Sequence, residues 1–262
     1  MNSSKIAIET HNLTVSYNRR PVLWNIDFSI PIGQITGIIG PNGSGKTTLL
    51  KAIMGLVPLS SGYVKVFDQD LNDARERISY VPQRESVDWD FPASVMDVVL
   101  MGRYRKGNIL KRLSKSDREL AIEALDKVNM LEFSHRQISQ LSGGQQQRVF
   151  IARSLAQGAD LYIMDEPFVG VDAATEEAIL TLLSEMKKAG KTVVVVHHDL
   201  QTAKDYFDWI VLLNTRLVAA GPKKEIFEGD LLQEAYGGKL NVLSQVGDLV
   251  KEKSFPIREK KT

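Results

Sequence analysis

The chain has 262 residues, of which 43% are apolar and 25% are charged, as in an ordinary globular protein with a sizeable core. Its 33 lysines and arginines nearly balance its 32 aspartates and glutamates, which argues against nucleic-acid binding, and the absence of cysteine excludes disulfides, zinc–thiolate sites and thiol catalysis. No apolar run approaches the roughly 20 residues of a membrane-spanning helix, and no signal-peptide core follows Met1–Lys5. We therefore expect a cytosolic protein that reaches a membrane only by docking.

The first forty residues predict β-strands. Ile6–Ile8 and Leu13–Val15 are short apolar runs, and every second residue over Trp24–Ile30 is apolar, which is the period of a strand with one buried face. Tyr17 lies in the polar segment between these runs. It is either a packing residue or an aromatic surface on which an adenine could stack.

A glycine-rich segment follows the apolar run Ile35–Ile39 and precedes a helix predicted over Thr48–Met54. This order matches the phosphate-binding loop G-x-x-x-x-G-K-[ST]. Glycines let the backbone wrap a phosphate chain without Cβ clashes, and the helix N-terminus adds unpaired N–H groups and a positive dipole end. The alternative is a turn that binds nothing. The residues expected at the phosphates are Gly40, Pro41, Asn42, Gly43, Ser44, Gly45, Lys46, Thr47 and Thr48, with Lys46 on the β/γ-phosphates and Thr47 on Mg²⁺.

A strand predicted over Ile78–Val81 runs into Gln83, a polar residue at the carboxyl edge of a sheet, where ligand sites of α/β proteins form. Taken alone, its position favours an ordinary loop residue over a ligand-binding one. From about Ser94 to Ala156 the pattern is helical, with a capping box expected over Ser116–Glu119 and Leu120 on the buried face after it. The basic segment 102–112 is either a solvated loop or a docking surface. The stretch predicts a helical subdomain inserted into the sheet domain.

A second possible anion site begins the helix at residue 143. Ser142, Gly143, Gly144 and Gln145 place small residues and free backbone N–H groups at a helix start, where a negative group is favoured. The alternative is that Ser142 is simply the N-cap of the helix.

The buried strand Leu161–Asp165 ends in two adjacent carboxylates, Asp165 and Glu166. Like charges this close raise each other's pKa unless a cation or a reacting water occupies the site. With a phosphate loop in the same sheet, we assign Asp165 to Mg²⁺ and Glu166 to the attacking water.

Asp172 is predicted to cap a helix that ends near Gly190. A buried strand, Thr192–Val196, then leads into His197 and His198. Neighbouring strand residues point to opposite faces, so the two histidines do not suggest a shared metal ion. We expect one of them to face the γ-phosphate. The charged end of the chain is predicted to be solvated.

In this order the motifs resemble the ATP-binding subunits of ABC transporters over roughly residues 6–230. The resemblance implies an α/β fold: a P-loop NTPase (RecA-like) core with an N-terminal antiparallel β subdomain and an inserted helical subdomain. It implies one ABC ATPase domain, with the core and β subdomain at 1–85 and 157–225, the helical subdomain at 86–156 and a C-terminal extension at 226–262.

The resemblance also implies roles. In the family, two such subunits pair head-to-tail, and each ATP is sandwiched between the phosphate loop of one and the signature residues of the other. Ser142 and Gly144 would therefore serve the nucleotide of the second copy, and Asp172 would lie across the interface. His198, which precedes Asp199 as the family's histidine precedes an aspartate, would hold the γ-phosphate. Glu166, His198 and Gln83 form the implied catalytic set, Thr47, Gln83 and Asp165 the Mg²⁺ set, and Tyr17 stacks on the adenine of ATP.

A narrower resemblance, to the manganese, zinc and iron branch of these importers, rests on Val87–Pro92, Val98–Tyr104 and Asp165–Asp172. It implies an ATPase that powers metal uptake, with manganese favoured, through a membrane permease contacted by Gln83 and residues 86–113. An extracytoplasmic solute-binding protein would be an indirect partner, nucleic acid would not, and the subunit would be peripheral on the cytoplasmic face of the cell membrane. The alternatives are another transported substrate or a soluble ABC ATPase outside transport.

Overall fold

The computed structural model describes residues 5–18, 20–104, 113–228 and 230–237. Arg105, Lys106, Lys111 and Arg112 of the basic segment, and the charged end of the chain, lie outside the described residues. Within them, no helix is both long enough and apolar enough to cross a membrane.

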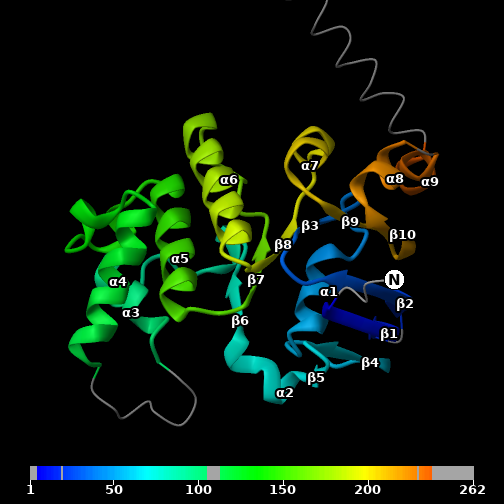
Figure 1. Ribbon diagram of the computed structural model, residues 1–262, viewed down its shortest axis with the longest axis horizontal. Coiled ribbons are helices and arrows are strands. Elements are labelled where there is room, and N and C mark those ends of the chain that lie inside the picture. Colours follow the sequence, from blue (N-terminus) through cyan, green and yellow to red (C-terminus); the bar gives the residue numbers. More distant parts are fainter. Residues whose placement is uncertain (1–4, 19, 105–112, 229, 238–262) are drawn as a thin grey trace, which may run out of the picture.

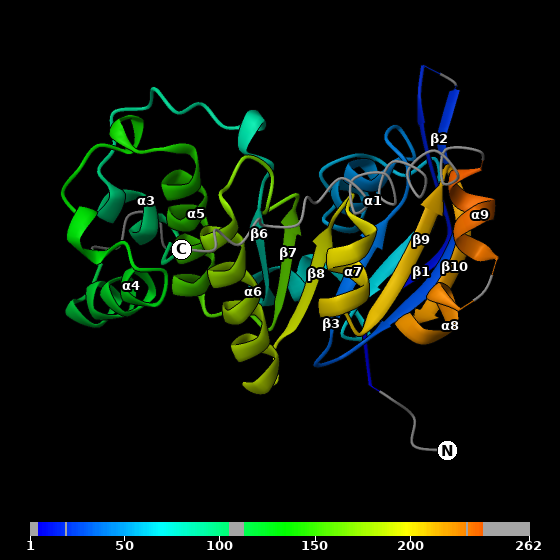
Figure 2. The same ribbon diagram turned by 90° about the horizontal axis from the view of Figure 1, so that it is seen from above.

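A six-stranded sheet forms the centre of the molecule, in the order β10-β9-β3-β8-β7-β6. The strands β9, β3, β8, β7 and β6 are parallel, and β10 is an antiparallel edge strand. Figure 2 shows the parallel strands side by side with α6 and α7 over one face. The bounds are β3 Ile35–Ile39, β6 Ile78–Val81, β7 Leu161–Asp165, β8 Thr192–Val196, β9 Trp209–Asn214 and β10 Arg216–Pro222.

A second, antiparallel sheet has the order β2-β1-β4-β5. Its strands are β1 Ile6–Tyr17, β2 Arg20–Pro31, β4 Ser61–Val66 and β5 Gln69–Asp70. The two short runs expected at the N-terminus are therefore one long strand. The expected burial of Trp24 is wrong, since its side chain is 48% exposed and Leu23 is buried instead. Asn25 has φ 51° at a register shift of the β1–β2 pair, and this irregularity breaks the alternation.

Two hydrophobic cores lie on the two faces of the central sheet. Along β8, Val193 and Val195 face one core and Val194 and Val196 face the other, so a run of four valines still alternates between two environments. One core contains the helices after residue 94, and the other joins the central sheet to β1, β2 and helix α1, Lys46–Ile53.

Helices α3, α4 and α5 lie at the opposite end of the molecule from β1, β2 and β4 (Figure 1). Between β6 and β7 the described residues contain no strand, in agreement with the expected helical character of this stretch. The helices are α2 Leu71–Ala74, α3 Val95–Met101, α4 Lys115–Lys127, α5 Gly143–Gln157, α6 Ala173–Lys188, α7 Leu200–Tyr206, α8 Lys223–Phe227 and α9 Leu231–Tyr236.

The expected cap of α4 is wrong by two residues. Ser114 forms the capping box with Asp117: the Ser114 N–H donates to Oδ2 of Asp117 at 3.0 Å and the Asp117 N–H donates to the Ser114 Oγ at 3.2 Å. Arg103 donates to Asp117 at 2.9 Å and strengthens this start over the one at Ser116. Leu120 is 38% exposed, not buried as expected.

Helices α8 and α9 extend the fold beyond the last strand. Ile226, Ala235 and Tyr236 are buried, and Asn214, at the end of β9, donates to the carbonyl oxygen of Ala235 at 3.0 Å. In both views the two helices lie beside β9 and β10 (Figures 1 and 2).

Candidate active site

The shape of the glycine-rich loop depends on glycines that adopt positive φ angles. Gly45 has φ 97° and is the N-cap of α1, which begins at Lys46, two residues before the expected start. A Cβ at Gly45 would lie 2.6 Å from Cδ2 of Leu23, whereas at Gly43, with φ 82°, it would meet no atom within 4 Å. Only glycine adopts these conformations without strain. The glycines therefore let the backbone turn tightly in front of the N-terminus of α1, which suits the binding of a phosphate chain.

Lys46 lies folded back into this loop. Its Nζ donates to the carbonyl oxygens of Gly40 at 2.9 Å and Pro41 at 3.1 Å, and the residue is buried. Burial lowers the pKa of Lys46, and the nearby charges of Glu166 and Asp165 oppose this. The ammonium has three N–H groups. Two of them donate to the loop carbonyls, and the third can donate to a phosphate oxygen.

Asp165 and Thr47 join the loop to the tip of β7. The Thr47 hydroxyl donates to Oδ1 of Asp165 at 3.2 Å, and Oδ2 of Asp165 is buried with no hydrogen-bond partner in the described part of the chain. Burial raises the pKa of Asp165, the Thr47 hydrogen bond lowers it, and Glu166 raises it further. A hydroxyl and an unsatisfied carboxylate oxygen are ligands that Mg²⁺ prefers, so these residues fit that ion.

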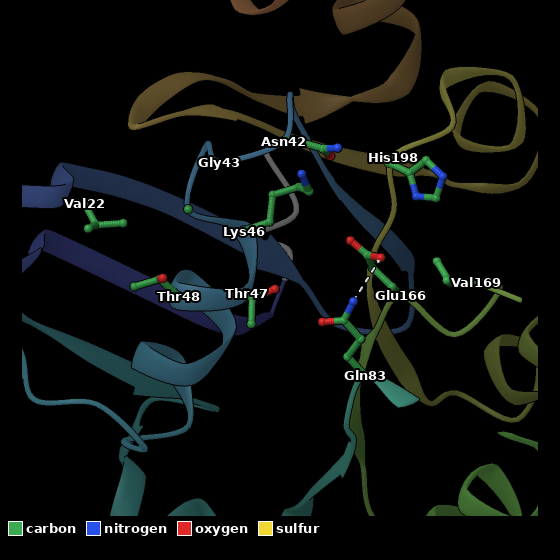
Figure 3. Close-up of a pocket in the computed structure, with 11 residues that line it drawn as sticks. Val22, Asn42, Gly43, Lys46, Thr47, Thr48, Gln83, Glu166, Val169 and His198 are labelled. Atoms are coloured by element: carbon green, nitrogen blue, oxygen red, sulfur yellow. Dashed lines mark hydrogen bonds between the residues drawn. The ribbon is translucent and has the colours of Figure 1, made fainter. Parts of the chain in front are cut away.

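Glu166 has a left-handed backbone, with φ 50°, and its N–H donates to the carbonyl of Val196 at 3.2 Å. Strained residues of this kind gather at functional sites. The Gln83 amide donates from Nε2 to Oε2 of Glu166 at 3.5 Å and to Oε2 of Glu85 at 3.1 Å. Figure 3 shows the amide of Gln83 pointing toward Glu166.

Lys46, Thr47, Gln83 and Glu166 line one open cavity of about 560 Å³, whereas the buried Asp165 is not among its lining residues. The cavity draws together segments that lie far apart in the sequence, namely the phosphate loop, the end of β6, the end of β7 and the end of β8 (Figure 3). The lining residues are Val22, Asn42, Gly43, Gly45, Lys46, Thr47, Thr48, Gln83, Glu166, Val169 and His198. Val22, on β2, and Val169, in the turn after β7, were not expected, because a single apolar residue carries no local signal of a binding role.

The two neighbouring histidines have different environments. His198 is exposed and lines the cavity, whereas His197 is 3% exposed and packs against Phe168 and Phe207. Burial, and to a smaller extent the neighbouring His198, lowers the pKa of His197 to about 4. Of the two, only His198 is therefore placed to meet a bound phosphate.

The second possible anion site lies outside this cavity. Ser142 is the N-cap of α5 and forms a capping box with Gln145, whose N–H donates to the Ser142 Oγ at 3.4 Å. A Cβ at Gly144 would lie 3.6 Å from Oγ1 of Thr175, an ordinary contact, so the fold of this chain does not itself require a glycine there. Asp172 caps α6 by accepting from the Thr175 N–H at 2.7 Å, and that hydrogen bond lowers the pKa of Asp172.

Tyr17 is 46% exposed at the end of β1 and does not line the cavity. Its side chain is accessible from outside, so it is not the packing residue of the first alternative. Stacking on an adenine stays a prediction.

The sequence matches the model of the ABC transporter family over residues 23–169. The chain is similar to the manganese transport system ATP-binding protein MntB of Bacillus subtilis (strain 168), at 60% identity over 90% of this chain and 94% of that protein. It is also similar to the zinc transport system ATP-binding protein TroB of Treponema pallidum (strain Nichols), at 55% identity over 92% of this chain and 91% of that protein.

Among solved structures, the fold is similar to a nucleotide-free ATP-binding cassette from an ABC transporter. The TM-score is 0.78 and the sequence identity 25%, over 89% of this chain and 99% of that one.

Proposed function

This chain belongs to the ABC transporter family, and we propose that it is the ATP-hydrolysing subunit of an importer that takes up a transition-metal ion, with manganese favoured over zinc or iron. The observation that carries the ATPase assignment is the single cavity in which the phosphate loop faces Gln83, Glu166 and His198. The metal is inferred from the names of the manganese and zinc relatives.

In the proposed mechanism the protein positions charged groups around the phosphates. Lys46 and the N–H groups at the start of α1 stabilise the negative charge that develops on the transferred phosphoryl group. Glu166 accepts the proton of the attacking water, with its carboxylate oriented by Gln83. His198 contacts the γ-phosphate. Thr47, Gln83 and Asp165 would hold Mg²⁺, which when bound neutralises charge on the phosphate oxygens.

The site is proposed to be completed by a second copy of the chain. Ser142–Gly144 lie outside the cavity, and Gly144 has room for a side chain that the protein does not use. A head-to-tail pair would bring these backbone N–H groups to the nucleotide of the partner, an arrangement in which the same two surfaces meet twice. Asp172, at the start of α6, would lie in the same interface.

The permease is proposed to dock at a second cavity, of about 650 Å³, between β6 and the ends of α3 and α5. Its lining includes Met101 and Tyr104, which are 42% and 47% exposed, and the charged residues Asp73, Arg75 and Arg153. Methionine, tyrosine and arginine are residue types that are enriched in protein interfaces. Residues 105–112 of the expected contact region 86–113 lie outside the described part. The subunit would then be peripheral on the cytoplasmic face, with a solute-binding protein on the other side.

The test is to reconstitute the subunit with its membrane partners in proteoliposomes and to measure ATP hydrolysis with MgATP on one side and manganese, zinc or iron on the extracytoplasmic side. Selective stimulation by manganese is expected. Stimulation by another class of solute would leave the ATPase assignment standing and overturn the metal. Failure of the subunit to associate with any membrane protein would favour a soluble ABC ATPase.

A further inference from the structure

Two consecutive residues on the loop after β6 reach two different parts of the site. Gln83 contacts the carboxylate of Glu166 at the cavity. The next residue, Arg84, contacts α5, whose first turn carries the residues assigned to the second copy. One loop therefore touches both halves of the proposed composite site.

Arg84 makes a forked contact with α5. Its Nε and Nη2 donate to Oε1 of Gln146 at 3.2 and 3.1 Å, and a Cβ at Gly143 would lie 3.0 Å from its Cζ. Gln146 is buried and donates from Nε2 to the carbonyl of Ile138 at 3.1 Å, so the acceptor is itself held in place. A planar guanidinium that donates twice to a fixed oxygen defines position and orientation together.

Trp89 holds the backbone of the same loop. Its indole Nε1 donates to the carbonyl of Arg84 at 2.8 Å, and its ring packs edge-on against Phe150 with 4.9 Å between the centroids. Phe150 and Gln146 are four residues apart and lie on one face of α5. The loop is thus attached to the first two turns of α5 through both a side chain and a backbone carbonyl, and a displacement of the loop moves the start of the helix.

We propose that Arg84 is a positioning residue: its fork to Gln146 holds the start of α5, and with it Ser142–Gly144, in the orientation that a second copy requires. The inference rests on the proposed head-to-tail function. It adds a residue to that function: Arg84 does not line the cavity, and it acts through Gln146, through its packing against Gly143 and through the loop backbone.

The test uses the full chain with Glu166→Gln, which blocks hydrolysis, and follows ATP-dependent dimerisation by analytical ultracentrifugation in the presence of Mg²⁺. Adding Arg84→Ala or Gln146→Ala should raise the ATP concentration needed for half-maximal dimer about tenfold, since a charge-assisted hydrogen bond is lost. The affinity of the monomer for a fluorescent ATP analogue should not change. The double variant should be no worse than either single one, because both remove the same bond.

Arg77→Ala is the matched control, because Arg77 is also half-exposed and pairs with a carboxylate, that of Asp160, away from the cavity. It should dimerise like the parent. Arg84→Lys keeps the charge but not the fork, so it should give an intermediate shift even if Arg84→Ala folds poorly. Unchanged dimerisation of Arg84→Ala, or additive losses in the double variant, would overturn the inference alone. A parent that stays monomeric at saturating ATP would overturn the head-to-tail function with it.

Discussion

The hydroxyl of Thr47 donates to the carboxylate of Asp165 at 3.2 Å and so joins two residues that are 118 positions apart in the chain. This contact connects the start of α1 to the end of β7. It also leaves the other oxygen of Asp165 buried and without a partner in the described residues, at the edge of the phosphate loop. The folded chain thus carries an unsatisfied acceptor where a bound cation would be needed.

Asp165→Asn should therefore stabilise the chain without ligand and weaken its response to magnesium and nucleotide. Burial raises the pKa of Asp165, so at neutral pH the folded state holds an unfavourable charge that the amide removes, and we expect a rise in the unfolding temperature. Calorimetry in EDTA and then with Mg²⁺ and ATP measures both effects. Asp160→Asn is the control: Asp160 lies before β7 and its pKa is lowered, chiefly by Arg77, so this change should not stabilise the chain. Loss of stability in Asp165→Asn without ligand would contradict the prediction.

Glu166→Gln should keep nucleotide binding and lower turnover at least about 100-fold, since a general base contributes about that much or more. The amide can still accept from Gln83, so the loop geometry is retained. Steady-state phosphate release and the affinity for a fluorescent ATP analogue separate the two effects. Glu119→Gln, on the exposed side of α4, should behave as the unchanged protein. Near-normal turnover in Glu166→Gln would remove Glu166 from its assigned role.

Two inactive variants should restore activity when they are mixed. Lys46→Ala disables the phosphate loop, and Gly144→Asp places a negative charge at the start of α5, where the structure leaves room for a side chain. In a head-to-tail pair of the two variants, one site combines an intact loop with an intact α5 start. Turnover of the mixture, compared with each variant alone over a range of concentrations, measures this. A mixture as inactive as its components would indicate that each chain holds a complete site.

The buried His197 should make the chain sensitive to acid. Its pKa is about 4 in the folded state, against an ordinary value of 6.5. Between these values the unfolded chain binds a proton that the folded chain does not, so the free energy of unfolding falls as the pH decreases from 6.5 to 4, by roughly 3 kcal/mol at most. Urea denaturation across this range should show a weaker pH dependence in His197→Phe, whose ring can pack against Phe168 and Phe207. An identical pH dependence in both proteins would assign the acid sensitivity to other groups.

The sequence by itself determined the local parts of this protein. The phosphate loop, the strand that ends in Asp165 and Glu166, and the caps at Ser142 and Asp172 are encoded by short-range patterns, because backbone dihedrals, capping hydrogen bonds and hydrophobic periods depend on residues within a few positions. The family resemblance rests on the order of these parts, and the family match agrees with it.

Only the tertiary structure decided which side chains meet. Ser114 rather than Ser116 caps α4 because Arg103 reaches Asp117, and Trp24 is exposed because the β1–β2 register shifts at Asn25. Local patterns left open which histidine faces the cavity, and the choice of His198 came from the family resemblance alone. The sequence contained no sign that Arg84 binds Gln146. These contacts depend on the order of the strands and on how segments that are far apart in the sequence, in one case by more than a hundred residues, pack together. A pattern read along the chain fixes the backbone of each segment, but the cavity forms only where the packed sheet brings the segment ends together.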